Sequence, residues 1–150
     1  MLRKLRPLAE LSLPEFVLFS QLVFLSILVR AGLRLVSFPR LIALFTSCAN
    51  HARLRRLPLL HNRFEWNRIV ALVELAARGT SARGPCLVRS LLLFWLLMAR
   101  GEPAEILIGV SKETSHLEAH AWIETQGKVV GDSAAVIGRF ATLLRLSAKL

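Results

Sequence analysis

The chain has 150 residues, of which 54% are hydrophobic, and its 20 Lys and Arg against 10 Asp and Glu give a formal net charge of +10. This length suits one domain, and such a domain buries roughly 70% of its unfolded surface without disulfides. The apolar content excludes a disordered chain. The two cysteines and four histidines form no zinc-binding pattern, so we expect neither a metal nor a cofactor. We also expect the cysteines to be reduced and the chain to be cytosolic.

The basic charge is concentrated in the first half of the chain. Residues 1–68 hold 11 Lys and Arg and 3 Glu, whereas residues 69–150 hold 9 basic and 7 acidic residues. The basic half also contains the uncharged run 16–29, which is shorter than the about 20 residues that a membrane-spanning helix needs. We therefore expect residues 1–58 to form an apolar, basic helical region, and contact of 16–38 with a membrane surface stays an alternative.

Helical periodicity dominates most of the chain. Ser12, Pro14 and Glu15 are typical of the start of a first helix, which the proline at position 39 ends. Cys48 falls on the apolar face of the next helix and is expected to be a small core residue. Further helices are predicted at about 39–56, 62–78 and 86–100, with a closing amphipathic helix at 140–146.

The most informative segment is G-P-C-L-V-R-S-L-L-L-F-W-L-L-M-A-R-G at residues 84–101. Gly84 and Pro85 break the chain, so a helix begins at or beside Cys86. At a helix N-terminus, unpaired N–H groups and the helix dipole favour a thiolate over a thiol. Arg89, one turn further on, adds to this effect if it faces the same way. Simple packing of the cysteine is the alternative interpretation.

The pattern then changes to strands, which predicts an antiparallel meander behind the helix at 105–110, 119–124 and 128–132. With a three-residue turn, Glu124 pairs with Lys128, and His120 lies opposite Asp132 with about 5 Å between their Cβ atoms. A two-residue turn at 126–127 would place these two side chains on opposite faces. The inference therefore depends on the register.

Cys86, His120 and Asp132 combine a nucleophile, a base and an orienting carboxylate. The histidine would take or share the thiol proton, and the aspartate would hold its tautomer and stabilise the imidazolium. The backbone N–H of Cys86 is a natural oxyanion donor. Trp122 and His116 are candidate substrate-binding residues, for which core packing and a solvated loop are the respective alternatives.

Several ordered motifs over about residues 62–132 carry a family resemblance: C-L-V-R-S-L at 86–91, L-I-G-V at 107–110, A-H-A-W-I-E at 119–124 and G-K-V-V-G-D at 127–132. Together they resemble the lasso-peptide biosynthesis B protein, specifically its transglutaminase-like leader-peptidase half. The resemblance implies an α+β fold, with the N-terminal helical region followed by a papain- or transglutaminase-like core at 59–150.

The resemblance also implies a function. That function is cleavage of the leader from a ribosomally made precursor peptide, which frees the core's N-terminus for an ATP-using, asparagine-synthetase-like cyclase. By position, Cys86 would be the nucleophile, His120 the base and Asp132 the orienting group. A separate leader-recognition protein is expected, because the helices and the peptidase core use up the chain, and the basic, apolar N-terminal half is a candidate docking surface for it.

Two other classes of function stay open. One is transglutaminase-like acyl transfer on the same triad, in which an amine instead of water takes the acyl group. The other is a non-catalytic adaptor or membrane-associated helical protein, in which 16–29 is the functional element. A nucleic-acid partner is disfavoured, because no stacking aromatics are interleaved with the basic residues and tyrosine is absent.

Overall fold

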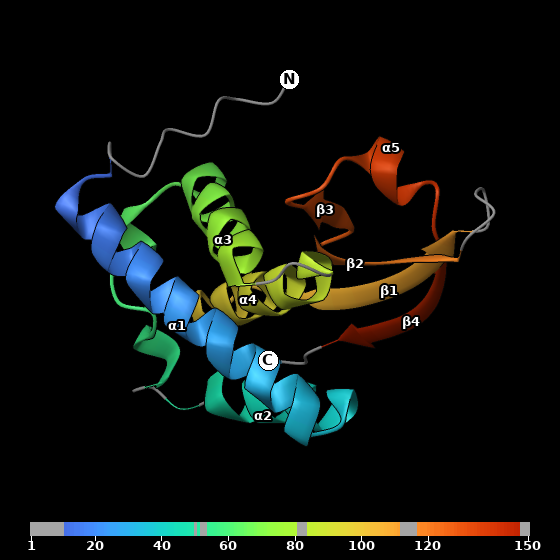
Figure 1. Cartoon of the computed structure of the whole chain (residues 1–150), viewed down its shortest axis with the longest axis horizontal. Coiled ribbons are helices and arrows are strands. Elements are labelled where there is room, and N and C mark those ends of the chain that lie inside the picture. The colour runs from blue at the N-terminus through green and yellow to red at the C-terminus, as the bar shows by residue number, and fades with distance from the viewer. Residues whose placement is uncertain (1–10, 50, 52–53, 81–83, 112–116, 148–150) are drawn as a thin grey trace.

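The computed structural model describes residues 11–49, 51, 54–80, 84–111 and 117–147. Most helices gather at one end of the molecule and a four-stranded antiparallel sheet lies at the other (Figure 1), which confirms the predicted α+β class. The main elements are α1 (Leu13–Leu35), α2 (Phe38–Ala49), α3 (Trp66–Thr80), α4 (Pro85–Ala99), β1 (Glu105–Ser111), β2 (Glu118–Thr125), β3 (Lys128–Val130) and β4 (Ala141–Ser147). Short helical turns occur at η2 (Leu54–Arg56), η3 (His61–Arg63) and α5 (Ala134–Ile137).

The start of α1 confirms the predicted helix cap. The backbone N–H of Ser12 donates to Glu15 Oε2 at 2.8 Å, which is one half of a capping box. Glu15 Oε1 also accepts a hydrogen bond from Arg68 Nε at 2.5 Å and so ties α1 to α3. The pKa of Glu15 is lowered to about 2. The hydrogen bond from Arg68 has the largest effect, and the hydrogen bond from the Ser12 backbone the next largest.

The second helix is shorter than predicted, because α2 ends at Ala49 and does not continue to Arg56. The backbone N–H of His51 donates to Cys48 O at 3.0 Å, and its ring Nδ1 lies 3.0 Å from Ser47 O. These contacts satisfy carbonyls in the last turn that a longer helix would otherwise use.

The third helix begins later and ends later than predicted. Residues 61–63 form a 3-10 turn and Phe64 is extended, so α3 starts only at Trp66. It continues past Gly79 to Thr80, whose hydroxyl donates to the carbonyl of Ala76 at 3.0 Å. Gly79 therefore does not close the helix.

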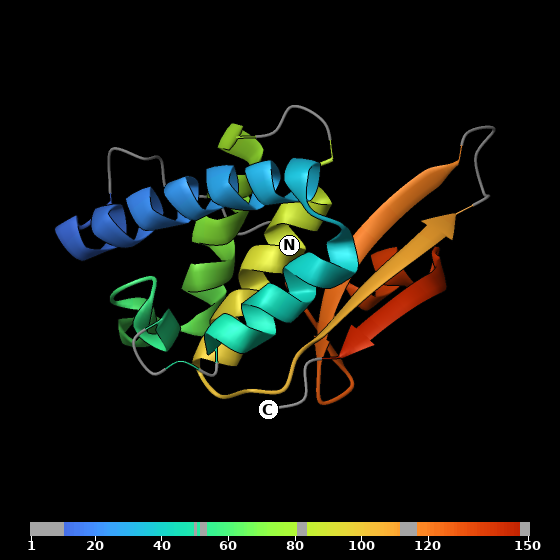
Figure 2. The same ribbon diagram turned by 90° about the horizontal axis from the view of Figure 1, so that it is seen from below.

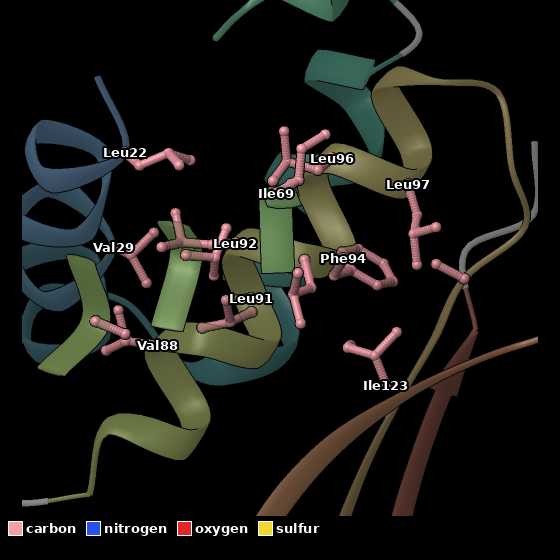
Figure 3. Close-up of a cluster of buried hydrophobic side chains, with 14 of the residues drawn as sticks. Leu22, Val29, Ile69, Val88, Leu91, Leu92, Phe94, Leu96, Leu97 and Ile123 are labelled. Carbon is pink, nitrogen blue, oxygen red and sulfur yellow. The ribbon is translucent and has the colours of Figure 1, made fainter. Parts of the chain in front are cut away.

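Helix α4 forms the centre of the hydrophobic core. It is apolar on nearly all sides and almost entirely buried, as is typical of a helix enclosed by other elements. Helices α1, α2 and α3 and strands β1 and β2 all pack against it. Figure 3 shows Leu22 of α1, Ile69 of α3 and Ile123 of β2 around the α4 side chains. Truncating a fully buried residue such as Leu91 to Ala in this core would cost about 2–5 kcal/mol.

The sheet has the strand order β3-β2-β1-β4, and its last strand corrects a prediction. Residues 141–147 form β4, which pairs antiparallel with β1, so the helix predicted at 140–146 is wrong. Without β4, β1 would be an edge strand with unpaired backbone groups, and pairing there outweighs the local helical pattern. Glu105 of β1 also accepts from Arg145 Nη1 at 2.7 Å and from Ser147 Oγ at 2.6 Å across the pair.

The hairpin between β2 and β3 has a different register from the one predicted. Thr125 pairs with Lys128, so the turn contains only Gln126 and Gly127. Both turn residues have positive φ values, 49° and 73°, as in the type I′ turns whose twist suits a hairpin. The predicted three-residue turn, and with it the pairing of Glu124 with Lys128, is therefore wrong.

The outward side of α1 is apolar along the length of the helix. Exposed large apolar side chains occur there at helical spacing: Leu13, Phe16, Val17, Phe24, Ile27, Leu28 and Leu35. The helix is longer than the uncharged run, because it continues through Arg30 and Arg34. By length and composition α1 is able to cross a membrane. Signal sequences and the core helices of soluble proteins are also long and apolar enough to do so. Of the most apolar 18-residue stretch of α1, 22% is buried.

An apolar cavity of about 310 Å³ lies where α1, α2 and α4 meet. Leu28 of α1, Cys48 of α2 and Trp95 of α4 are among its lining residues. Figure 2 shows α1 and α2 on the outside of the helical end of the molecule. Cys48 is half-buried among apolar side chains, on the helix face that the sequence indicated for it.

Candidate active site

Cys86 lies in the first turn of α4, as predicted. Gly84 adopts the left-handed conformation (φ 62°) and Pro85 is the first helical residue, which together turn the chain sharply into the helix. The thiol is free and half-buried. Because Leu87 follows it in the same first turn, the unpaired backbone N–H of Leu87 donates to the sulfur.

The edge of β2 beside Cys86 is completed by a helix. Within the described chain, β3 pairs only with residues 123–125 of β2. Every second residue of a strand directs its N–H and C=O to the same edge, so Ala121 presents both groups where β3 has already ended. The buried Ser90 Oγ donates to Ala121 O at 2.9 Å, and the Ala121 N–H donates to the sulfur of Cys86. One turn of α4 thus replaces the missing strand and fixes Cys86 beside β2.

His120 and Asp132 are in contact, although not by the predicted route. His120 Nε2 lies 3.3 Å from Asp132 Oδ2. In the observed register Asp132 would face Ala121 if β3 continued, but β3 ends at Val130 and Gly131 (φ 80°) redirects the chain. A Cβ atom at Gly131 would lie 3.1 Å from the Leu93 side chain of α4, so this position favours glycine for both its φ angle and its space.

The three groups shift one another's pKa values in the sense of an ion pair. Hydrogen bonds with Asp132 and then Cys86 raise the pKa of His120 to about 9, against the opposing effect of burial. The hydrogen bond with His120 lowers the pKa of Cys86, and this outweighs burial. Burial alone would raise the pKa of Asp132, but the His120 hydrogen bond and the charge of Arg89 together hold it below its ordinary value. Each of the three groups therefore favours its charged form, a thiolate, an imidazolium and a carboxylate, more than the isolated group would.

Arg89 of α4 stands between two carboxylates. Its Nη2 contacts Asp132 Oδ2, and its Nη1 lies 3.1 Å from Glu74 Oε2 of α3. Glu74 Oε1 in turn accepts from Arg78 Nε at 2.5 Å. The Arg89 and Asp132 side chains are each only 11% exposed, so this contact is largely shielded from solvent.

Two aromatic rings flank the imidazole of His120. The Phe140 ring centroid is 5.1 Å away with an interplanar angle of 28°, and the Trp122 centroid is 6.4 Å away with an angle of 14°. Trp122 is 2% exposed, its Nε1–H donates to Glu124 Oε1 at 3.1 Å, and its ring occupies space that a Cβ at Gly109 would need. Trp122 therefore packs against His120, and its direct contact with substrate stays a prediction. His116 lies outside the described residues.

Sequence reasoning missed three residues of this site. Glu74 lies on a helix whose charged residues were not singled out, and Phe140 belongs to the segment predicted as a helix. Ser90 stood inside the quoted C-L-V-R-S-L motif, but only the open edge of β2 gives it a partner.

Among the described residues, no three His, Cys, Asp or Glu side chains gather in a way that would hold a metal ion.

Comparison with known proteins places the chain in a family. The model of the transglutaminase-like superfamily matches residues 25–145, which is most of the chain, so the protein belongs to this superfamily. Neither a search of curated proteins nor a search of solved structures found a match.

Proposed function

We propose that the protein is a cysteine peptidase that removes the leader from a ribosomally synthesised precursor peptide, as in lasso-peptide maturation. The observation that carries the proposal is the run of contacts from Asp132 through His120 to Cys86 at the N-terminus of α4. Membership of the transglutaminase-like superfamily supports cysteine-based acyl chemistry, and the motif resemblance supports the precursor peptide as substrate.

In the proposed reaction, Cys86 Sγ attacks the carbonyl carbon of the scissile amide and forms a carbon–sulfur bond. The imidazolium of His120 gives its proton to the departing amine as the carbon–nitrogen bond breaks, which releases the core peptide with a free N-terminus. Water then attacks the thioester, His120 accepts a proton from the water, and the thiolate leaves. The released leader ends in a carboxylate. Asp132 stabilises the imidazolium that exists before the proton goes to the amine and again after the proton is taken from water, and the Cys86 N–H is the proposed oxyanion donor.

The test is mass spectrometry of precursor peptides encoded near this protein's gene, incubated with the protein and their leader-recognition protein in H₂¹⁸O. We expect a shortened leader that carries ¹⁸O in its new carboxylate. Cys86→Ser should abolish this product, whereas Cys48→Ser, the matched control, should retain it. A leader joined to an amine would instead show acyl transfer, and undiminished cleavage by Cys86→Ser would refute the cysteine mechanism.

The outward apolar face of α1 supports the proposal of a separate leader-recognition protein as a partner. A row of exposed large apolar side chains on a soluble protein typically marks an interaction surface. The described residues of this face carry basic and no acidic side chains: Arg34 is exposed and Arg30 is partly exposed. We therefore propose a partner surface that is apolar with an acidic rim. The ATP-dependent cyclase would act afterwards on the released core peptide.

A further inference from the structure

We propose that Arg89 is a positioning residue for the triad, which holds Asp132 against His120 by linking it to Glu74. This inference rests on the proposed function, because it concerns the same site. Arg89 itself touches neither the sulfur nor the imidazole in any described hydrogen bond or ion pair. Its effect on the reaction therefore passes through Asp132.

The guanidinium of Arg89 divides its donors between two carboxylates. An arginine that only neutralises a carboxylate commonly binds both carboxylate oxygens with its two terminal nitrogens. Here Nη1 contacts Glu74 of α3 and Nη2 contacts Asp132. Arg89 thus bridges the carboxylates of Glu74 and Asp132. Without it, these two negative charges would repel each other.

A single oxygen of Asp132 contacts both the arginine and the histidine. Asp132 Oδ2 contacts both Arg89 Nη2 and His120 Nε2. Asp132 follows Gly131, beyond the last strand pair, so the sheet does not fix its direction. The Arg89 contact supplies that constraint, and it comes from the same helix that carries Cys86 three residues earlier.

Arg89 is a buried charged residue. Arg89 as a whole residue is 9% exposed, and within the described chain its Nε has no hydrogen-bond partner. An arginine in such a place costs desolvation energy, which an apolar residue of similar size would avoid. Pure packing would be served better by methionine or leucine at this position. The charge at position 89 is therefore explained by its two carboxylate partners.

The experiment is the pH dependence of Cys86 alkylation by iodoacetamide in the full chain, read by peptide mapping. We expect Arg89→Met to raise the pH of half-maximal alkylation by about one unit, which is about tenfold slower alkylation at a pH well below both midpoints. Arg89→Lys keeps the charge, so its shift should be smaller. A shift should remain, because lysine cannot bridge two carboxylates in the same geometry. In an Asp132→Asn background, Arg89→Met should add no further shift.

The matched control is Arg100→Met at the other end of α4. Arg100 is also a partly buried arginine, and it donates to His61 O at 2.5 Å and Phe64 O at 3.1 Å, away from the site. Its variant should lower thermal stability without moving the alkylation midpoint. A wild-type midpoint in folded Arg89→Met would overturn the inference, and if Arg89→Met does not fold, the same result in Arg89→Lys would do so. An ordinary midpoint in the wild-type protein would instead refute the proposed function.

Discussion

Helices α1 and α4 are both long and apolar, yet the serines within them make different contacts. In α1, Ser20 and Ser26 donate to carbonyls of their own helix, Phe16 O and Leu22 O. In α4, Ser90 donates to the backbone of β2, and Arg89 reaches two carboxylates on other elements. Ser90 and Arg89 of α4 thus join separate elements, whereas Ser20 and Ser26 of α1 form hydrogen bonds only within their own helix.

The surfaces of the two helices differ in the same way. Helix α4 is enclosed by other elements on nearly all sides, and its one polar end meets β2 and the chain after β3. Helix α1 buries one side and leaves the other side apolar and exposed. Chemistry is therefore expected at the end of α4, and recognition of a partner along the side of α1.

The largest effect should follow from His120→Ala, which removes the group on which both neighbours depend. Loss of the base should slow leader release by about 10²- to 10⁴-fold and raise the pKa of Cys86 towards its ordinary value. Mass spectrometry of the leader and alkylation of Cys86 would measure the two effects. His51→Ala, at an exposed histidine of the helical end, should change neither. Normal leader release in His120→Ala would remove the basis for the triad.

A double variant, Phe24→Ser with Ile27→Ser, changes the outward face of α1 without touching α4. Because both side chains are at least half exposed, the fold and Cys86 alkylation should be unchanged, while leader cleavage that depends on the recognition protein falls about tenfold. The matched control is Leu143→Ser, which changes an exposed leucine on β4. Unchanged cleavage, with loss of binding to anionic vesicles instead, would assign the α1 face to a membrane.

Gly131→Ala should show how far the site depends on the turn after β3. Its Cβ would meet Leu93 at 3.1 Å and Val70 at 3.4 Å at a φ of 80°, so we expect a loss of about 2–3 kcal/mol in unfolding free energy and slower Cys86 alkylation. Gly127→Ala is the control, since Gly127 has a similar φ of 73° but open space around it. It should lose only about 1 kcal/mol and leave alkylation unchanged, by urea unfolding and peptide mapping. Equal losses in the two variants would mean that contact with α3 and α4 is unimportant.

The smallest effect is expected from Glu15→Gln at the start of α1. The pKa of Glu15 is lowered to about 2, so its stabilising effect is present above its ordinary value of 4.5 and is lost as the pH falls through about 2. At pH 7 the variant should lose about 1 kcal/mol of unfolding free energy, and the difference from wild type should shrink below pH 4.5. Urea unfolding at several pH values measures this. A constant difference down to pH 2 would exclude the charge as its cause.

The sequence predicted those parts of the fold in which local signals and tertiary packing agree. The cap at Ser12, the start of α4 at Pro85 and strand β1 all have strong local signals, and the structure confirms them. β4 was predicted as a helix, because the need of β1 for a second partner is not visible in residues 140–146 themselves. Tertiary pairing decides such a short segment.

The contact between His120 and Asp132 was predicted, but the strand register on which that prediction depended is wrong. His120 and Asp132 were expected to meet across a strand pair, but they meet because Gly131 and Arg89 direct Asp132 after the strand has ended. The positions of Cys86 and His120 relative to the helix and strand were readable from local patterns. The contacts of Glu74 and Ser90 were not, since each depends on an element distant in sequence.

The most direct test of Cys86 as an activated nucleophile is the pH dependence of its alkylation in the wild-type protein, with Cys48 as the internal control. We predict a Cys86 thiolate that forms well below the ordinary thiol pKa of about 8.5, and that loses this property in His120→Ala. An ordinary titration of Cys86, unchanged in His120→Ala, would contradict the proposed nucleophile.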